Sequence, residues 1–596
     1  MNILKFGFPI LTAFLLAIFF MSLPDLREAS GIQRREAGNH RKDVAVCGVI
    51  TVLYALIAFT NLGVTSSPVS FAQLDEGDAV VLELEKPAPL EKLYVYSGMT
   101  VGEYSVSFSE NGTEYYEIAV VDQNYAEILK WLDPDWDGLY PGPVQYIRLK
   151  GLSGNPRVGE LAAFSEGNPV SFRQSEDTAA KALTDEQDTV PSDDSYMNSS
   201  YFDEIYHVRT AEEHLESMTP YEISHPPLGK LIIGLGIRIF GLVPFGWRFM
   251  GTLFGVLMVP AIYMFLSCMF GSTVVSACGS ILLATDFMHF TQTRIATIDS
   301  FAVFFIILMY LFMYRYVTDG KNRNLALSGI FFGLGAASKW TCLYAGAGLA
   351  VIWLAFWGGK IISDKDDRKA TFSSFLKNCC FCLVFFVAIP GLIYYLSYYA
   401  YGTAKGMTGP GMLFTREYLQ TVLDNQSFML TYHSGVNATH PYSSKWYQWI
   451  LDIRPILYYL RYYSDGTRSS FGAFVNPALC WGGLISILML SFVAVRHRDN
   501  TAAFIVLGYL AQLVPWIPIS RVLFEYHYFA CTVFLVLAVG YLFNVMNNMK
   551  SGKWYVIGFA SLSALLFLLF YPVISGLRVD SEAASAMLGW LPTWPF

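Results

Sequence analysis

The chain has 596 residues, of which 54% are hydrophobic and 16% aromatic, and its mean hydropathy is +0.39. This composition excludes an ordinary soluble globular protein. Apolar runs of about 20 residues, each long enough to cross a bilayer, recur along the sequence. The formal net charge of -8 gives no indication of nucleic-acid binding. We therefore expect a polytopic α-helical membrane protein, with the lipid bilayer and no nucleic acid among its partners.

The N-terminal region, 1–64, predicts two transmembrane helices, at 4–22 and 44–63. The loop between them is rich in Lys and Arg, which assigns it to the cytoplasm by the positive-inside rule. No clear small-residue cleavage site follows the first helix, so we expect it to be retained rather than removed as a signal peptide. The chain would then emerge on the extracytoplasmic side.

Residues 65–165 show the period-two alternation of β-strands, for example at 80–85 and 146–150, with turns rich in Gly, Pro, Asn and Asp between the runs. We expect an inserted extracytoplasmic β-sandwich of jelly-roll type. Its ending, YIRLKGLSGNPRVGELAAF, resembles the last strands of discoidin-type, galactose-binding-like domains. A packing or spacer domain and a carbohydrate- or partner-binding domain both remain open. Residues 166–198, acidic and rich in Ser, predict a flexible linker.

Residues 199–596 form the main membrane region, which begins with a short helix at the membrane edge, predicted at 231–243. Basic residues in alternate loops give a self-consistent orientation, and it faces the polar segments 199–230 and 400–473 outward. With the two N-terminal helices, the total is about twelve spans. The further spans are predicted at 248–268, 273–290, 300–316, 325–340, 342–357, 378–399, 475–495, 502–518, 528–545 and 554–573.

The adjacent acids Asp203 and Glu204 are the first candidates for chemistry. Carboxylates at the mouth of a membrane bundle cost free energy, so their presence indicates a functional role. In the alternative interpretation, Asp203 or a neighbouring serine caps a helix. Glu204 and His207 are three residues apart on one helical face, a spacing that also suits a divalent metal. Two ligands alone do not define a metal site.

Four cations lie near helix ends on the same predicted face as the acid pair: Arg248, Arg294, Lys339 and Arg521. A cluster of cations beside an apolar region suits a phosphate or pyrophosphate held at the lipid–water boundary. The alternative is that each side chain reaches the interface by snorkelling.

The outward segment 400–473 contains an aromatic stretch, HPYSSKWYQWILDIRPILYYLRYY at 440–463. Its Trp and Tyr residues predict a helix lying in the membrane interface. Aromatic rings beside polar groups would also suit stacking on sugars. His433 and His440 are further polar candidates of low specificity.

Seven ordered blocks of the sequence resemble the protein O-mannosyltransferase family, and they cover roughly 200–545. Between 400 and 473 there is no room for the β-trefoil domain of the eukaryotic members, so the chain resembles the bacterial branch. The β-sandwich and the first helix are additions to the family pattern. The blocks are DEIYHVRTAEE (203–213), SHPPLGKLIIGLGIRIFG (224–241), WRFMGTLFGVLMVPAIY (247–263), DFMHFTQTRIATIDSF (286–301), GIFFGLGAASKWTCLY (329–344), HPYSSKWYQWILDIRPILYY (440–459) and SRVLFEYHYF (520–529).

The resemblance implies a GT-C glycosyltransferase that moves a sugar, mannose in this family, from a polyprenyl-phosphate donor to an acceptor hydroxyl outside the cytoplasm. The expected location is the plasma membrane. The family's acid pair falls on Asp203 and Glu204, with Asp203 as the general base and Glu204 orienting it or the acceptor. The lipid phosphate is already a good leaving group, so the four cations would replace a general acid.

Further residues are expected to shape this site without taking part in the chemistry. No metal ligand is assigned and no cofactor is certain, although a divalent metal stays open. The site-shaping residues are His225, Pro226, Asp299 and His527.

Four hypotheses remain from the sequence. The acceptor would be a Ser or Thr of a protein, or else a cell-wall polymer or lipid-linked glycan. A membrane transporter is a different class, but its charges would lie nearer the mid-bilayer, and the sequence has no internal repeat. The intact Asp203 and Glu204 argue against a non-enzymatic sugar sensor or scaffold only through the family resemblance.

Overall fold

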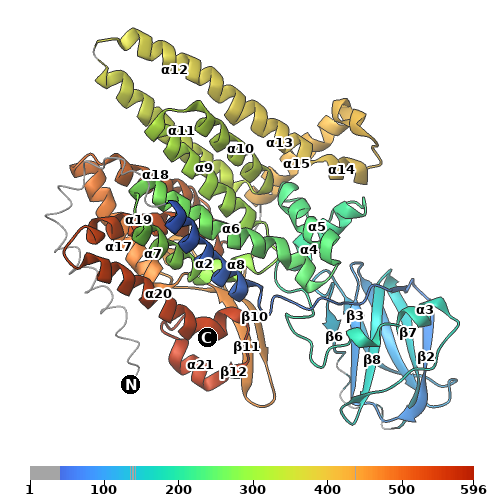
Figure 1. The fold of residues 1–596 in the computed structure, drawn as a ribbon. Helices are drawn as coiled ribbons and strands as arrows, with labels where there is room; N and C mark the ends of the chain where they lie inside the picture. Colours follow the sequence, from blue (N-terminus) through green and yellow to red (C-terminus); the bar gives the residue numbers. More distant parts are fainter. Residues whose placement is uncertain (1–39, 135, 137–139, 141, 365, 436–437) are drawn as a thin grey trace. The chain divides into compact units, whose positions relative to one another are not determined.

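The computed structural model describes residues 40–596, apart from 135, 137–139, 141, 365 and 436–437 (Figure 1). The described chain forms two compact units. A helical unit contains the residues up to Thr60, Glu213–Ile233 and Phe249–Phe596, and a sandwich unit contains Asn61–Glu212 and Gly234–Arg248. The predicted first span, 4–22, lies outside the described residues.

The sandwich unit contains two antiparallel sheets, as the period-two patterns predict. One sheet has the order β2-β7-β4-β5, and the other has β1-β8-β3-β6 with β9 beside β8. The strands are β1 (Ala72–Gln73), β2 (Ala79–Ala88), β3 (Lys92–Ser97), β4 (Gly102–Ser109), β5 (Tyr116–Gln123), β6 (Trp131–Leu132), β7 (Val144–Gly154), β8 (Arg157–Ser165) and β9 (Asn168–Pro169).

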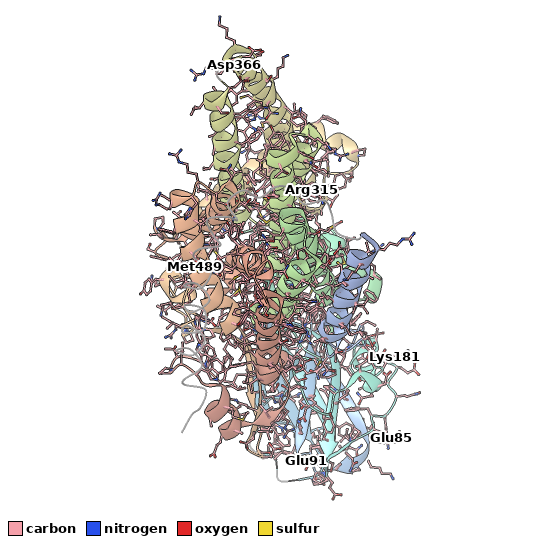
Figure 2. The ribbon with its side chains drawn as sticks, turned by 60° about the vertical axis from the view of Figure 1, so that its left-hand side comes forward. Glu85, Glu91, Lys181, Arg315, Asp366 and Met489 are labelled. Atoms are coloured by element: carbon pink, nitrogen blue, oxygen red, sulfur yellow. The ribbon has the colours of Figure 1, made fainter. Side chains whose placement is uncertain are left out.

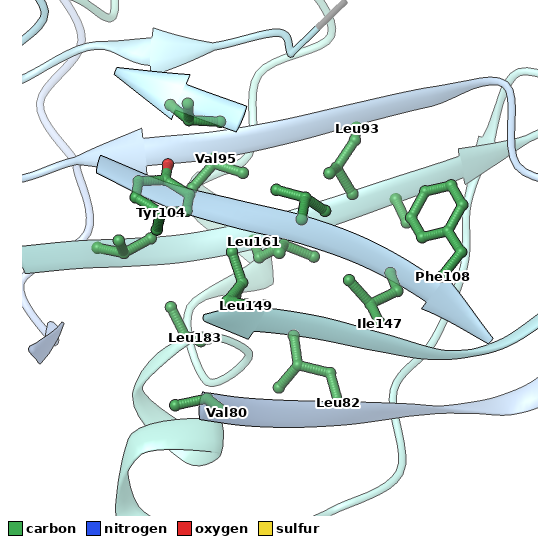
Figure 3. Close-up of a cluster of buried hydrophobic side chains, with 14 of the residues drawn as sticks. Val80, Leu82, Leu93, Val95, Tyr104, Phe108, Ile147, Leu149, Leu161 and Leu183 are labelled. Atoms are coloured by element: carbon green, nitrogen blue, oxygen red, sulfur yellow. The ribbon is translucent and has the colours of Figure 1, made fainter. Parts of the chain in front are cut away.

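The core of the sandwich unit follows from this alternation. Val80 and Leu82 of β2 point inward together with Ile147 and Leu149 of β7, and Leu93 comes from the opposite sheet (Figure 3). Each fully buried aliphatic side chain contributes about 1.5–3 kcal/mol relative to exposure to water. The charged side chains of Glu85, Glu91 and Lys181 lie at the surface of this unit (Figure 2).

The segment predicted as a flexible linker, 166–198, is folded against the sandwich, so that prediction is wrong. It holds β9, a short helix α3 (Thr178–Ala182) and a 3₁₀ turn η2 (Gln187–Thr189). Ala180 and Leu183 join the hydrophobic core. Two apolar contacts and the backbone bonds to β8 are enough to order a segment whose composition alone suggested disorder.

Glu160 on β8 is buried beneath this segment. The backbone N–H of Glu186 donates to its Oε2 at 2.9 Å, and the Gln187 amide donates to the other oxygen. Burial raises the pKa of Glu160 to about 7, and the charges of Asp185 and Glu186 raise it further while the two hydrogen bonds oppose the shift.

We expect the sandwich unit to lose stability as the pH rises from about 4.5 to 7, because the folded state prefers the protonated form of Glu160. Glu160→Gln mimics that form and should remove the loss. Hydrogen exchange of β8 in the full chain measures it: wild type and variant should match at pH 5, and the variant should be better protected at pH 8. Equal protection at pH 8 would contradict the prediction, and Glu85→Gln on the exposed face of β2 is the control.

The helical unit contains long apolar helices, as predicted. Among the described residues, eight helices are long and apolar enough to cross a membrane, or nine if the pair α7–α8, bent by 58°, is one span. The α-helices of the described chain, apart from α3, are α2 (His40–Phe59), α4 (Glu204–Leu215), α5 (Leu228–Phe240), α6 (Pro244–Phe270), α7 (Thr273–Ala284), α8 (Phe287–Thr293), α9 (Asp299–Asp319), α10 (Asn322–Ser338), α11 (Thr341–Ser363), α12 (Arg368–Cys382), α13 (Ile389–Ser397), α14 (Tyr399–Ala404), α15 (Arg416–Gly435), α16 (Trp446–Trp449), α17 (Pro477–Arg496), α18 (Asn500–Leu513), α19 (Phe529–Asn547), α20 (Gly552–Ser575) and α21 (Ser581–Leu588). Of these, 204–212 in α4, 234–240 in α5 and 244–248 in α6 belong to the sandwich unit.

The helices differ in how much of their apolar surface the protein covers. The apolar window of Glu525–Asn547, which contains α19, is 94% buried and therefore lies inside the bundle. The window of Arg368–Ala404, with a π-helical turn at Leu383–Ala388, is 6% buried and therefore faces lipid. Asp366 lies at the turn between α11 and α12 (Figure 2). The short helix predicted at 231–243 is confirmed as α5.

The interfacial helix predicted at 440–463 is wrong. Only the four residues of α16 are helical, and the chain then forms a hairpin of β10 (Ile456–Tyr462) and β11 (Thr467–Ala473), extended by β12 (Val579–Asp580). Asp465-Gly466 supplies the turn, with Gly466 at φ 80°. The aromatic run is equally suited to a strand, and this Asp-Gly turn decides the outcome.

Candidate active site

The acid pair lies at the start of α4 in the sandwich unit. Phe202, directly before it, has a φ of 48°, and the carbonyl of Asp203 accepts the backbone N–H groups of Tyr206 and His207. Ser199 and Ser200 do not cap the helix: the Ser199 hydroxyl accepts from the Trp131 backbone and the Ser200 hydroxyl donates to the Ile128 carbonyl. These bonds tie the turn before α4 to the sandwich.

Glu204 is held by Arg248 of α6. Nε of Arg248 donates to Oε1 at 2.7 Å and Nη2 donates to Oε2 at 2.8 Å, and both side chains are fully buried. The remaining guanidinium donors reach the carbonyls of Leu62, Tyr196 and Ser199 at 2.6–2.9 Å. A bidentate pair of this kind fixes the position and orientation of the carboxylate.

The two acids therefore have different environments. Both oxygens of Glu204 are occupied by Arg248, while the side chain of Asp203 is half-buried. The role of Asp203 as the base stays a prediction. The hydrogen-bond donors of Arg248 are engaged with protein acceptors. Direct phosphate binding by Arg248 stays a prediction.

A metal at Glu204 and His207 gains no support from this geometry, since Arg248 neutralises Glu204. In the described part of the chain, the group of acids with closely placed oxygens is elsewhere, at Glu160, Asp185 and Glu186. No metal ligand is assigned.

Arg294 lies at the end of α8 in the helical unit. Its Nε donates to the carbonyl of Ala58 at 3.1 Å and its Nη2 donates to that of Thr60 at 2.7 Å, so it caps the end of α2. Its guanidinium also stacks 4.6 Å from the Phe290 ring. Phosphate binding by Arg294 stays a prediction.

Lys339 ends α10 and pairs with Asp299, which begins α9, at an Nζ–Oδ1 distance of 2.7 Å. The ammonium also lies 5.5 Å from the centre of the Tyr526 ring. His527, on the neighbouring 3₁₀ turn, stacks on Trp449 with ring planes 11° apart. The structure thus brings together Asp299, Lys339 and His527, which the sequence placed in one site without assigning contacts.

The loop before α5 is ordered by a buried ion pair that the sequence analysis missed. Lys230 pairs with Glu222 and donates to the carbonyl of His225 at 3.2 Å. Nδ1 of His225 lies 3.0 Å from the Ser224 hydroxyl, and Pro226 is buried beside it. The lysine of the HPPLGK block is the sequence signal for this ion pair, because a lysine is buried only at a high cost unless an acid pairs with it.

His433, a weak candidate from the sequence, belongs to this group. Its Nε2 lies 2.8 Å from the Ser224 carbonyl, and its ring centre is 5.2 Å from that of His225. Burial lowers the pKa of His433 to about 4, and the positive charges of Arg521 and Lys339 contribute. The imidazole is therefore neutral at physiological pH, and Nε2 is the donor.

A cavity of about 860 Å³ opens in the helical unit beside His433. Three cations line it, Lys445, Arg454 and Arg521, together with His440, and its described lining contains no carboxylate. Within the described chain, Arg521 forms no hydrogen bond or ion pair. The cavity is therefore suited to an anion.

Two further acids are buried in the helical unit. Asp452 and Glu525 are fully buried, and Asp452 accepts the Val475 N–H at 3.1 Å. Burial raises the pKa of Asp452 to about 7.

Comparison with known proteins adds to these observations. Residues 224–395 match the family model described as dolichyl-phosphate-mannose-protein mannosyltransferase, and residues 418–594 match the C-terminal four-transmembrane region of protein O-mannosyltransferase. The polyprenol-phosphate-mannose–protein mannosyltransferase of Corynebacterium glutamicum is 27% identical over 430 residues, which cover 62% of this chain and 81% of that relative. Its counterpart in Mycobacterium tuberculosis is 24% identical over 440 residues, with the same coverage.

The fold also has a solved counterpart. The Saccharomyces cerevisiae protein O-mannosyltransferase complex bound to its sugar donor superposes with a TM-score of 0.58 at 13% identity, over 67% of this chain and 89% of that chain. The chain is thus a polytopic membrane protein with the GT-C fold. The two family matches together span more than half of its length, and the chain belongs to the protein O-mannosyltransferase family.

Proposed function

We propose that this chain is an inverting glycosyltransferase that transfers mannose from a polyprenyl-phosphate donor to a Ser or Thr hydroxyl of a protein. The observation that carries the proposal is the asymmetry of the acid pair: Arg248 neutralises Glu204, which leaves Asp203 as the base. The named activity of the bacterial relatives supports the donor and the acceptor class.

The proposed reaction is a single displacement. The acceptor oxygen attacks the anomeric carbon and forms the new C–O bond while its proton passes to Asp203. The bond between the anomeric carbon and the phosphate oxygen breaks, and its electron pair leaves with the polyprenyl phosphate. Cations stabilise that developing charge, so no general acid is needed. Glu204 takes no part in the proton transfer in this scheme, because Arg248 occupies both of its oxygens.

We further propose that the reaction occurs on the extracytoplasmic side of the plasma membrane. The support is the distribution of Lys and Arg, which assigns the loop after the first predicted helix and the α11–α12 turn to the cytoplasm. In the sequence, the sandwich unit lies between α2, which would cross the membrane outward, and α6, which would cross it inward. The unit would therefore be extracytoplasmic.

The test uses purified protein in detergent, a polyprenyl-phosphate carrying labelled mannose, and a Ser/Thr-rich peptide. Label in the peptide supports the proposal. Consumption of the donor without labelled peptide would move the acceptor to a cell-wall polymer or a lipid-linked glycan, for which the sandwich unit offers an added binding domain. A donor that is neither bound nor consumed would contradict the proposal.

Arg521 is the strongest candidate for binding the donor phosphate, because it lines the anion-suited cavity and is not paired with a described residue. We expect Arg521→Gln to lower kcat/KM for the donor by about 10- to 100-fold, the worth of a hydrogen bond to a charged group. Initial rates at varied donor concentration measure it. Lys181→Gln, an exposed lysine of the sandwich unit, is the control. Unchanged kcat/KM in Arg521→Gln would remove Arg521 from the site.

A further inference from the structure

The segment after the lipid-facing helix α13 forms an arm in the helical unit. The arm consists of α14, a 3₁₀ turn η4 (Pro410–Phe414) and α15. Tyr398, Met412 and Tyr418 form a small hydrophobic cluster that ties α15 back to the end of α13. Neither the family assignment nor the proposed reaction assigns a role to this arm.

Helix α15 has three distinct faces. The first packs on protein and contains polar side chains: Asn425 is buried, donates to the Ile223 carbonyl at 2.9 Å and accepts from the Tyr398 hydroxyl at 2.6 Å. The second is exposed and polar, with Gln420 and Asp424 hydrogen-bonded to each other. Both faces are satisfied.

The third face of α15 is exposed and apolar. Leu419, Leu423 and Leu430 are 47%, 52% and 65% exposed. At 3.6 residues per turn they fall within a stripe of about 40°. Phe414, at the tip of η4 just before the helix, is 91% exposed.

This apolar stripe requires an apolar partner. Each leucine left in water forgoes about 1.5–3 kcal/mol of burial, while the same helix buries Asn425 and Thr421 against the protein. A helix in water would place these groups the other way round. The arrangement fits a helix with lipid on one side, water on the second and protein on the third.

The surroundings identify the partner as lipid rather than protein. The stripe follows directly on the segment Arg368–Ala404, whose apolar surface is almost entirely uncovered by protein. Lys405 and Arg416, which flank η4, are exposed, and cations at such positions suit lipid phosphates. In the described chain, α15 is not among the helices apolar enough to span a membrane.

We propose that the arm from Lys405 to His433 lies in the membrane surface as an interfacial element, with Phe414, Leu419, Leu423 and Leu430 in the acyl-chain boundary. His433, in the last turn of α15, lines the 860 Å³ cavity. The arm therefore sets that part of the cavity at headgroup level. The use of this placement for a lipid donor rests on the proposed function, but the docking itself does not.

The test places a fluorescent amino acid at single positions of the full chain in lipid nanodiscs. Leu423 and its neighbour Asp424 are a matched pair, on the apolar and polar faces. Acyl-brominated lipids should remove most of the fluorescence at 423 and little at 424, while aqueous iodide should do the reverse. The readout is depth, so it stands whether or not mannose is transferred.

Two outcomes would overturn the proposal. Iodide quenching at 423 without lipid quenching would place the stripe in water, and protection from both quenchers would indicate a covering protein. If the variant at 423 does not fold, position 414 replaces it, because a side chain 91% exposed has little packing to lose. The same two quenchers then distinguish lipid from water at position 414.

Discussion

Asp203→Asn is expected to abolish mannosyl transfer while the protein remains folded. A general base contributes about 10²- to 10⁴-fold to the rate, and the amide has the shape of the carboxylate but cannot accept the proton. Transfer of labelled mannose to peptide, with wild type and variant side by side, measures the loss. The binding of the donor should change little, because the proposed phosphate ligands are not altered.

The fold should survive this substitution for a structural reason. Asp203 supports α4 through its main-chain carbonyl, which accepts from Tyr206 and His207, and asparagine keeps that carbonyl. Asp122→Asn, an exposed acid on β5, is the control for the loss of one negative charge. Transfer at the wild-type rate in Asp203→Asn would show that the base has been assigned to the wrong residue.

The architecture was largely predictable because its signals are local. Period-two alternation in 80–85 and 146–150 required one buried face, and β2 and β7 provide it. Apolar runs likewise marked the spans. The failures occur where two structures share a pattern: the aromatic run at 456–462 suits an interfacial helix or a strand, and only Asp465-Gly466 favoured the hairpin.

The position of the acid pair was predictable from the sequence, but the separate roles of its two acids were not. Adjacent acids at 203–204 are visible in the sequence, yet nothing local says which one is neutralised. Arg248 is 44 residues from Glu204, and a buried arginine at a helix end has the same sequence pattern as one that snorkels. Its other partners are carbonyls, which carry no residue-specific signal. Such contacts depend on tertiary structure.

The pair of Glu204 and Arg248 gives the second large expected effect. Arg248→Met should destabilise the sandwich unit by about 3–5 kcal/mol, because it leaves a carboxylate buried without a counter-charge. It should also abolish transfer, since Glu204 would no longer hold the turn before α4. Thermal unfolding followed by tryptophan fluorescence, together with the transfer assay, measures both. Arg238→Met, an exposed arginine of the same unit, is the control.

The double variant Glu204→Gln/Arg248→Met separates charge from packing. It removes the unpaired carboxylate, so its unfolding midpoint should lie above that of Arg248→Met alone. It should still lie below wild type, because the carbonyls of Leu62, Tyr196 and Ser199 lose their donor. Strictly additive losses would contradict a direct pair. Transfer should stay absent in the double variant even where stability recovers, because the bidentate geometry that orients the acid pair is gone.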